Sequence, residues 1–421
     1  MTLAVLDAGM TTVSLPRLAQ SFGSSPADAI HLVTAYQSAL VMALLPLGAM
    51  GERYGHQRIF SLSVALFAAA SAFAALASDL AWLTAARFVQ GLGAAGIMAV
   101  GMALLRFIVP EGQLGRAIGW NALNVALASA AAPTIAALVL TLGDWRGLFA
   151  INLPIAALAL LGSRTLPATP RAKTPPDAVS MSLSALMFAM LIVAAQTAMA
   201  APPLAAMLLL IAVLALMALL RREAPKTAPM FPLDLLRSQS FRLSATASVF
   251  CFAAQTAGLV ALPFLLQHQL HQTPIATALY FTVWPLSVAV SALLAGRLSD
   301  RAPTAWLCAM GAGALAAGLA ACAVASHPAE VLPGIAAAGL GFGLFQSPNN
   351  RNLFLSAPAE RSGAAGGMQG TARVSGQTAG ALIVALMLAQ LGLDAALPAV
   401  FAAAALLGLA AAFASLFRIF T

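Results

Sequence analysis

The sequence predicts an all-α membrane protein with two bundles of six transmembrane helices and one further helix pair inserted between them. Of the 421 residues, 61% are hydrophobic and 8% are charged, and the mean hydropathy is +0.92. A soluble chain of this length needs a far more polar surface. The apolar stretches are long and lack the alternation of a membrane β-barrel. Basic residues gather in every second connection between them, as positive-inside topology requires.

Apolar runs suitable for crossing a bilayer occur fourteen times. A spanning helix needs about 20 mostly apolar residues. The runs 146–163 and 202–220 are short, but the second ends clearly at Arg221 and Arg222. The predicted helices are 1–20, 29–50, 57–78, 80–105, 115–140, 146–163, 179–199, 202–220, 242–266, 273–295, 304–325, 329–348, 363–389 and 394–419.

Two polar segments divide the chain. Residues 165–177 and 221–241 are rich in proline and basic residues, which is typical of extended linkers. They enclose the short helix pair 179–220. The predicted organisation is an N-terminal six-helix bundle at 1–164, linkers with the inserted pair at 165–241, and a C-terminal six-helix bundle at 242–421.

Basic residues also predict orientation. One set of alternate connections begins with Arg53 and Arg58 and stays basic to the C-terminus, whereas the opposite set holds only Arg17 and Arg146. Basic connections remain in the cytoplasm. We therefore expect a multi-pass protein of the bacterial inner (plasma) membrane with both termini in the cytoplasm, which requires an even number of helices.

The net charge of +8 does not indicate a nucleic-acid partner, because the basic residues punctuate the loops and do not cluster with aromatic residues. The three cysteines lie inside apolar runs and lack metal-ligand spacing. No nucleophile–base pair or phosphate-binding loop is evident. We therefore expect no metal, no cofactor and no enzymatic activity.

The stretch 48–60, GAMGERYGHQRIF, joins two apolar runs and carries its charges between glycines. Gly48, Gly51 and Gly55 would let the chain reverse within a few residues. A shorter copy, GRLSDR at 296–301, also joins two apolar runs. Two uses of one turn design suggest two bundles related by duplication.

The 48–60 stretch resembles G-x-L-a-D-r-x-G-r-k, the cytoplasmic loop after the second helix of the major facilitator superfamily. Glu52 stands where that family usually has Asp, and Arg58 keeps one of its basic charges nearby. The segment DWRGLFAINLPIA at 144–156 and the spacing L-D-x-x-x-x-x-V-x-L-P near the N-terminus resemble the drug:proton antiporters with fourteen helices (DHA2-like). The resemblance implies a major facilitator fold and proton-driven drug export.

Charged residues of the two related loops are candidates for a cytoplasmic gate. Acids and bases at facing helix ends can hold two bundles together in one state and release them in another. A solvated positive-inside loop would also explain the bases. The gate candidates are Gly48, Glu52, Arg53, Gly55, Arg58, Asp300 and Arg301.

Asp7 is the only acidic residue well within a predicted span, because all the others lie in loops or at helix ends. A charge at depth costs about 2.5–3.5 kcal/mol on insertion scales, so intramembrane acids usually serve a task. Burial favours the protonated carboxyl, which would let Asp7 hold and release a proton as a cavity opens and closes. Alternatively, Asp7 lies near the interface and snorkels, because it is only about 9 Å along the helix from Met1.

Arg87 begins RFVQGLGAAG in the predicted fourth helix, and Asp7 is the only acid in a neighbouring span. Arg87 would favour the charged carboxylate, so a change in their separation would switch proton affinity. The segment resembles the family's fourth-helix motif, with Gln90 in register. The alternative is an arginine bonded to backbone carbonyls. The glycines of this segment indicate close helix packing and not phosphate binding, because no strand precedes them.

The segment SAAAPTIAALVL at 129–140 stands where the family has the antiport motif G-P-x-x-G-G. The small residues Ala132 and Ala136 still permit close helix packing, and Pro133 frees a backbone carbonyl. In the family this motif tracks export. The loss of every glycine therefore leaves the direction of transport open.

Polar and aromatic residues in the pore-side helices are candidates for substrate binding. An amphiphilic drug fits a mainly apolar cavity with a few hydrogen-bonding groups. Each residue could instead be an interhelical polar group, and Arg373 could face a cavity or reach Asp300. The candidates are Tyr36, Gln37, Asn121, Asn124, Gln255, Trp284, Phe345, Gln346 and Arg373.

Together these features predict a proton-coupled antiporter that exports hydrophobic or cationic drugs by alternating access, with one proton site. The alternative is a narrow transporter of one metabolite or organic acid, attracted by Arg87 and Arg373. A membrane receptor or scaffold is the remaining alternative. We expect a monomer whose partners are an amphiphilic small molecule, protons and the lipid bilayer.

Overall fold

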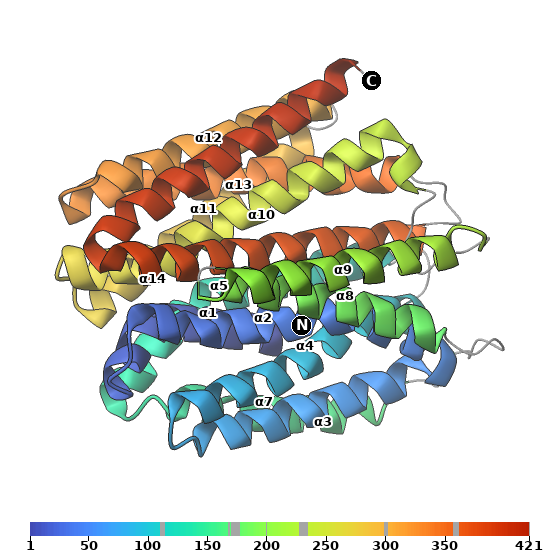
Figure 1. Ribbon diagram of the computed structural model, residues 1–421, viewed down its shortest axis with the longest axis horizontal. Helices are drawn as coiled ribbons and strands as arrows, with labels where there is room; N and C mark the ends of the chain where they lie inside the picture. Colours follow the sequence, from blue (N-terminus) through green and yellow to red (C-terminus); the bar gives the residue numbers. More distant parts are fainter. Residues whose placement is uncertain are drawn as a thin grey trace. The chain divides into compact units, whose positions relative to one another are not determined.

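The computed structural model describes the whole chain except residues 110–113, 167–168, 170–176, 199, 227–234, 299–301, 357–361 and 421. Its described residues form helices and no strands (Figure 1). The helices before residue 224 are α1 (Thr2–Ser21), α2 (Pro26–Tyr54), α3 (His56–Ala75), α4 (Leu80–Ile108), α5 (Leu114–Leu142), α6 (Gly147–Ala150), α7 (Asn152–Ser163), α8 (Ala178–Thr197) and α9 (Pro202–Glu223). The later elements are η2 (Leu235–Arg237), α10 (Gln239–Phe264), η3 (Leu265–Gln269), α11 (Pro274–Leu298), α12 (Thr304–Val324), α13 (Pro328–Leu355), α14 (Ser362–Phe417) and η5 (Arg418–Phe420).

Helices coincide with all the predicted apolar runs, with two differences in continuity. The predicted run 146–163 is divided into α6 and α7 at Ile151. The last two predicted runs are joined as α14, whose two arms meet at Gly392 (φ 69°, ψ 169°) (Figure 1). Glycine adopts this positive φ without the strain that a side chain would cause. The chain therefore bends between the two runs without a separate loop.

In the described part of the chain, ten helical segments are long and apolar enough to cross a membrane by length and composition. The helix α1 is outside this set. Two apolar helical segments are shorter, namely Leu127–Leu142 within α5 and Gly147–Ser163, which contains α6 and α7. The polar residues of α1, Asp7 and Arg17 among them, lower its hydropathy. An all-α membrane protein is thus confirmed, whereas the number of fourteen spans stays a prediction.

The chain folds as two compact units. The first comprises Met1–Asp7, Leu32–Ala128 and Arg146–Leu233, and the second comprises Ala8–His31, Ser129–Trp145 and Asp234–Thr421. The division of the sequence into bundles at 164 and 242 stays a prediction.

In the first unit, glycines of α4 permit close approach of its neighbours. A Cβ on Gly91 would lie 2.3 Å from the Tyr36 carbonyl oxygen of α2, and one on Gly93 would lie 2.8 Å from the Ser63 carbonyl oxygen of α3. Distances this short exclude any side chain. The packing function predicted for these glycines is therefore confirmed.

The turn between α2 and α3 differs from the predicted loop. Gly55 alone makes the reversal, with φ 99°, because α2 continues through Gly48 and Gly51 to Tyr54. The prediction that Gly48 and Gly51 form the turn is wrong. Gly51 instead brings α2 against α4, since its Cβ would lie 2.6 Å from Val100 Cγ1.

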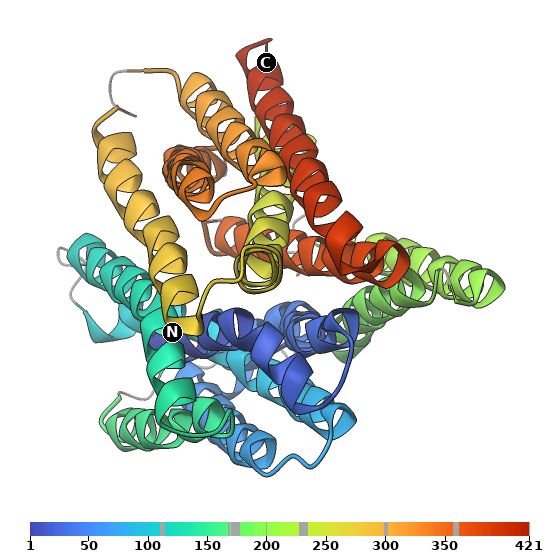
Figure 2. The same ribbon diagram turned by 90° about the vertical axis from the view of Figure 1, so that its left-hand side faces the viewer.

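In the second unit, α10 packs along the first arm of α14 and α12 packs beside the second arm, as Figure 2 shows. Gly376 and Gly380 of α14 lie against α10, where their Cβ atoms would be 2.4 Å from the carbonyl oxygens of Val249 and Ala253. These two glycines, four residues apart, therefore let α14 and α10 pack closely.

Candidate functional site

The Asp7 side chain lies inside the first unit, with 1% of its surface exposed. The alternative of a carboxylate that snorkels to the interface is therefore wrong for this structure. The side chain belongs to the second turn of α1, which begins at Thr2. A carboxyl group buried to this extent requires hydrogen-bond donors.

Arg87 of α4 is the first of these donors. Its guanidinium, 1% exposed, donates through Nη1 to Asp7 Oδ2 and forms an ion pair with it. The same group also donates through Nε to the Leu32 carbonyl oxygen at 3.4 Å. Its carbon Cζ lies 4.3 Å from the centre of the Tyr36 ring, within the range of a cation–π contact. Both predictions for Arg87, the acidic partner and the backbone carbonyl, thus apply together.

Gln90 lies one turn after Arg87 and completes the α4 side of the site. Its Nε2 donates to Asp7 Oδ1 at 2.9 Å and to Ser71 Oγ of α3 at 2.8 Å, while its Oε1 accepts from Arg87 Nη1. Residues three apart on a helix share one face, which explains why both side chains reach the same carboxylate. The resemblance aligned Gln90 with the family's fourth-helix motif, and the structure shows that its side chain contacts both Asp7 and Arg87.

Asn152 is the member that the sequence reasoning missed. It is the first residue of α7, immediately after the break at Ile151, and it is fully buried. Its Nδ2 donates to Asp7 Oδ1 at 2.6 Å. Asn152 belongs to the segment at 144–156 that resembles the family, but the sequence of an apolar run does not show which helix a side-chain amide within it faces.

We call Asp7, Arg87, Gln90 and Asn152 the proton site, because the sequence predicts that Asp7 binds a proton. N–H donors surround its carboxylate. Three of them reach its two oxygens, and one carries a full positive charge. A hydrogen-bond donor therefore reaches each oxygen of the carboxylate, and this offsets the free-energy cost of burying it.

The candidate substrate residues of the first unit have different environments. Tyr36 is buried beneath Arg87 and donates through its hydroxyl to the Ala4 carbonyl oxygen at 3.4 Å, so it belongs beside the proton site. Gln37 is partly buried, and its Oε1 has no hydrogen-bond partner in the described structure. Asn124 is exposed, and the side chain of Asn121 is outside the described residues.

The remaining substrate candidates lie in the second unit. Phe345 is fully buried in α13, and Trp284 of α11 is 4% exposed, with no hydrogen-bond partner for its indole N–H among the described residues. Gln255, Gln346 and Arg373 are partly buried. A closed packing around Phe345 means that a substrate could contact it only after rearrangement.

The gate candidates are only partly within the described structure. Glu52 and Arg58 are exposed, and Arg53 is partly buried. Asp300 and Arg301 lie outside the described residues. The gate stays a prediction.

The residues that stand where the resemblance implies an antiport motif lie in α5, with Ala132 and Ala136 fully buried and Pro133 inside the helix. Ala132 faces Gly9 of α1, where an added Cβ would lie 2.7 Å from the Ala132 Cβ. The glycine of this contact is therefore on α1, and the alanine is on α5. Close approach is preserved although the motif has lost its glycines.

A polar cluster in the second unit was not predicted. Arg418 of η5 is 8% exposed and donates through Nη1 to Ser244 Oγ at 2.7 Å and to Asn349 Oδ1 at 3.0 Å. Asn349 in turn donates through Nδ2 to Ser248 Oγ at 2.8 Å. The serines are four residues apart on α10, so they share one face. The cluster binds the end of the chain to α10 and α13.

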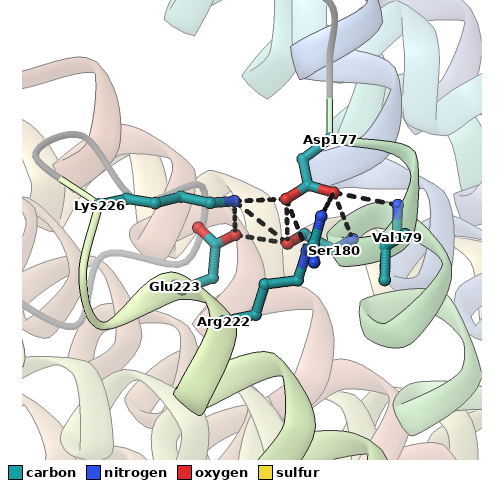
Figure 3. Close-up of polar contacts among 6 residues, drawn as sticks. All are labelled: Asp177, Val179, Ser180, Arg222, Glu223 and Lys226. Carbon is teal, nitrogen blue, oxygen red and sulfur yellow. Dashed lines mark hydrogen bonds and ion pairs between the residues drawn. The ribbon is translucent and has the colours of Figure 1, made fainter.

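A third polar cluster closes the helix pair α8 and α9, which lie side by side in both ribbon views (Figures 1 and 2). Asp177 accepts hydrogen bonds from the backbone N–H groups of Val179 and Ser180 at the start of α8. Arg222 donates to both of its carboxylate oxygens, at 2.8 and 3.0 Å, and Lys226 Nζ donates to Oδ2 at 2.6 Å (Figure 3). We call Asp177, Ser180, Arg222, Glu223 and Lys226 the hairpin clasp.

Within the hairpin clasp, Glu223 is fully buried and accepts from Ser180 Oγ at 2.5 Å and from Lys226 Nζ (Figure 3). The hydrogen bond from Arg222, with those from Lys226 and Ser180, holds the pKa of Asp177 well below its usual value, against the opposing effect of burial. The sequence predicted Arg222 as an orientation signal only. Its partner could not be inferred, because Asp177 is 45 residues away.

A family model described as the Major Facilitator Superfamily matches residues 1–381 and 244–421. The crystal structure of a POT family transporter in complex with a thioalcohol-conjugated peptide covers 100% of this chain and 95% of its own, with a TM-score of 0.76. At 14% sequence identity, this likeness concerns the fold alone.

Three relatives are similar over most of their length. The uncharacterized transporter YebQ of Escherichia coli (strain K12) is 41% identical, over 93% of this chain and 87% of its own. The riboflavin transporter RibZ of Clostridioides difficile (strain 630) is 26% identical, over 88% of this chain and 82% of its own. The tetracenomycin C resistance and export protein of Streptomyces glaucescens is 27% identical, over 92% of this chain and 74% of its own.

Proposed function

The chain belongs to the major facilitator superfamily, a family of membrane transporters and not of enzymes, and on this premise we propose that it is a proton-coupled antiporter that exports hydrophobic or cationic drugs. The observation that carries the proposal is the buried Asp7 carboxylate, paired with Arg87 inside the first unit. An ionisable pair at such depth is costly and is usually retained for a task.

The transport cycle follows from the two states of Asp7. In the state described here, three N–H donors stabilise its carboxylate. A proton from the outer side neutralises the carboxylate, weakens the contact with Arg87 and favours the alternate packing of the helices. Release of the proton to the cytoplasm restores the pair. The free energy of the proton gradient thereby drives drug export, with one proton site per chain.

The name of the Streptomyces glaucescens relative, a resistance and export protein, supports drugs as substrates. We propose that the polar and aromatic candidates named above contact the drug and that the charged residues beside Gly55 act in the gate. The basic connections support a multi-pass protein of the bacterial inner membrane with both termini in the cytoplasm.

Substrate-driven proton release from the detergent-solubilised protein tests this function. Addition of a drug should release protons from the wild type and not from Asp7→Asn, which cannot ionise. Asp394→Asn is the matched control, because the Asp394 side chain is 84% exposed. Proton release that survives in Asp7→Asn would refute the proton site.

A second candidate function is transport of a single metabolite. The name of the riboflavin transporter RibZ favours it, because that relative is also similar over most of this chain. Growth of an expressing strain on a panel of unrelated toxic compounds separates the two candidates. Protection against several unrelated cations supports drug export, and protection against none, together with uptake or efflux of one metabolite in vesicles, supports the alternative.

A further inference from the structure

The proton site has one oxygen that can accept a proton with little rearrangement. Asp7 Oδ2 is occupied by Arg87, the only basic side chain seen to contact it among the described residues. Asp7 Oδ1 accepts from two neutral amides, Gln90 Nε2 at 2.9 Å and Asn152 Nδ2 at 2.6 Å. An oxygen that becomes O–H cannot keep both N–H donors in line, so one amide must turn away or turn round.

Gln90 is fixed in its present orientation. Besides the bond to Asp7, its Nε2 donates to Ser71 Oγ at 2.8 Å and its Oε1 accepts from Arg87. Rotation of its carboxamide by half a turn would place its oxygen against two acceptors, Asp7 Oδ1 and Ser71 Oγ, and its N–H groups against the Arg87 guanidinium. Such rotation would break three hydrogen bonds in a buried place, where each is expensive to lose.

Asn152 has the opposite arrangement. Its carboxamide makes one hydrogen bond, through Nδ2 to Asp7 Oδ1, and its Oδ1 is buried without a hydrogen-bond partner in the described structure. The residue is fully buried, so an unused acceptor there is uncommon. The present orientation is required while Asp7 is ionised, because the reverse orientation would place two oxygens at the Asp7–Asn152 distance of 2.6 Å.

We propose that Asn152 turns its carboxamide round when Asp7 takes up a proton, so that Asn152 donates to the carboxylate and accepts from the carboxylic acid. Half a turn about the terminal torsion exchanges Nδ2 and Oδ1 at nearly the same place. This torsion has a broad, roughly two-fold energy profile. The proton binds at Asp7 Oδ1, and the free Oδ1 of Asn152 becomes its acceptor. Asn152 is thus a positioning residue that keeps both protonation states hydrogen-bonded.

The other groups around Asp7 do not offer this exchange. The described contacts of the carboxylate come from Arg87 and Gln90 on α4 and from Asn152 on α7. Tyr36 of α2 contacts Arg87 and donates to the Ala4 carbonyl oxygen, and Ser71 of α3 contacts Gln90. Asp7, Arg87 and Tyr36 are therefore the titratable groups of these contacts, and Asn152 is the uncharged group with a spare acceptor.

Infrared difference spectroscopy of the full-length protein in lipid tests the proposal, which rests on proton binding by Asp7. Acidification should produce a carboxylic acid C=O band that is absent from Asp7→Asn. With asparagine labelled by ¹³C at the side-chain carbonyl, a side-chain amide band should shift at the same pH, because the Asn152 oxygen gains a hydrogen bond. The shift should be absent from Asn152→Leu and retained in Asn350→Leu, a partly buried asparagine of the second unit.

The outcomes separate the proposal from the proposed function. An Asp7 band without any asparagine shift refutes the turning of Asn152 and leaves proton coupling intact. The absence of an Asp7 band refutes proton binding at Asp7, and with it both proposals.

Transport by variants gives a second readout, which does not depend on labelling. Asn152→Leu has nearly the same size but can neither donate nor accept, so proton-driven drug efflux should fall about tenfold. Asn152→Thr carries a hydroxyl that can do both, and should recover most of the efflux and the wild-type pH dependence. Equal loss in both variants, with an unchanged pH dependence, would indicate packing alone and would refute the proposal.

Discussion

The Asp7 carboxylate illustrates how a single charge is made tolerable inside an apolar bundle. An isolated carboxylate would be costly there, but Arg87, Gln90 and Asn152 supply one charged and two neutral donors. Tyr36 covers the guanidinium with its ring. Because the donors come from α4 and α7, a change in the charge of this one side chain on α1 would alter hydrogen bonds to two other helices.

Substitutions of Asp7 and of Arg87 should have non-additive effects on the stability of the folded protein. Arg87→Met leaves a buried carboxylate without its cation and should lower the stability of the folded protein by about 3–5 kcal/mol. The double variant Asp7→Asn/Arg87→Met should be more stable than Arg87→Met, because no uncompensated charge remains. Thermal unfolding of the four proteins in detergent measures the cycle. Additive losses would contradict a direct ion pair.

At the scale of helices, the contact between α1 and α5 depends on Gly9. Gly9→Ala would place its Cβ 2.7 Å from that of Ala132, so the helices must separate. Overpacking of this kind costs about 1–3 kcal/mol. The thermal unfolding temperature and the rate of drug efflux should both fall in Gly9→Ala. Both should recover in Gly9→Ala/Ala132→Gly, which restores the space between the helices. Failure of the second substitution to rescue the first would show that the glycine has another function.

The hairpin clasp should make the stability of α8 and α9 depend on acidity. The pKa of Asp177 is lowered by Arg222 and Lys226, so its contribution is fully present above the ordinary aspartate pKa of about 3.9 and is lost as the pH falls below that value. Asp177→Asn should cost about 1 kcal/mol at pH values near 7, since Arg222 is largely solvated.

This dependence is measurable by thermal unfolding of wild type and Asp177→Asn in detergent between about pH 7 and pH 3. The difference between the two proteins should be constant down to about pH 4 and should then shrink. The exposed Asp28→Asn serves as the control, because Asp28 bonds only to nearby Ser25 in the described structure. A difference that grows on acidification would have the wrong sign for a stabilised carboxylate.

At the scale of the whole molecule, the arrangement of basic connections predicts the sidedness of the chain. Ser78 follows α3 and is exposed, and Glu52, near the end of α2, is also exposed. In intact cells, a membrane-impermeant thiol reagent should label Ser78→Cys and should not label Glu52→Cys. The three native cysteines are buried, so they give little background. Labelling of Glu52→Cys from outside would contradict the proposed topology and indicate the opposite orientation.

The sequence alone was sufficient to predict the positions of the helices and one long-range contact, between Asp7 and Arg87. Apolar runs locate helices because each backbone polar group in a bilayer must be satisfied within its own segment. The pairing of Asp7 with Arg87 was predictable because an acid and a base, each inside an apolar run, have few other partners. The close contacts of Gly91 and Gly93 were predictable because these glycines lie inside an apolar helix that no strand precedes.

Only the tertiary structure decided which faces of those helices meet. That choice brought Asn152 to Asp7, opposed Gly9 to Ala132, and buried Arg418 among Ser244 and Asn349. It also showed that α2 continues through Gly48 and Gly51 to a turn at Gly55. Hydropathy determines that a segment is buried in lipid or protein, whereas the rotation and crossing of each helix depend on side chains from distant parts of the chain.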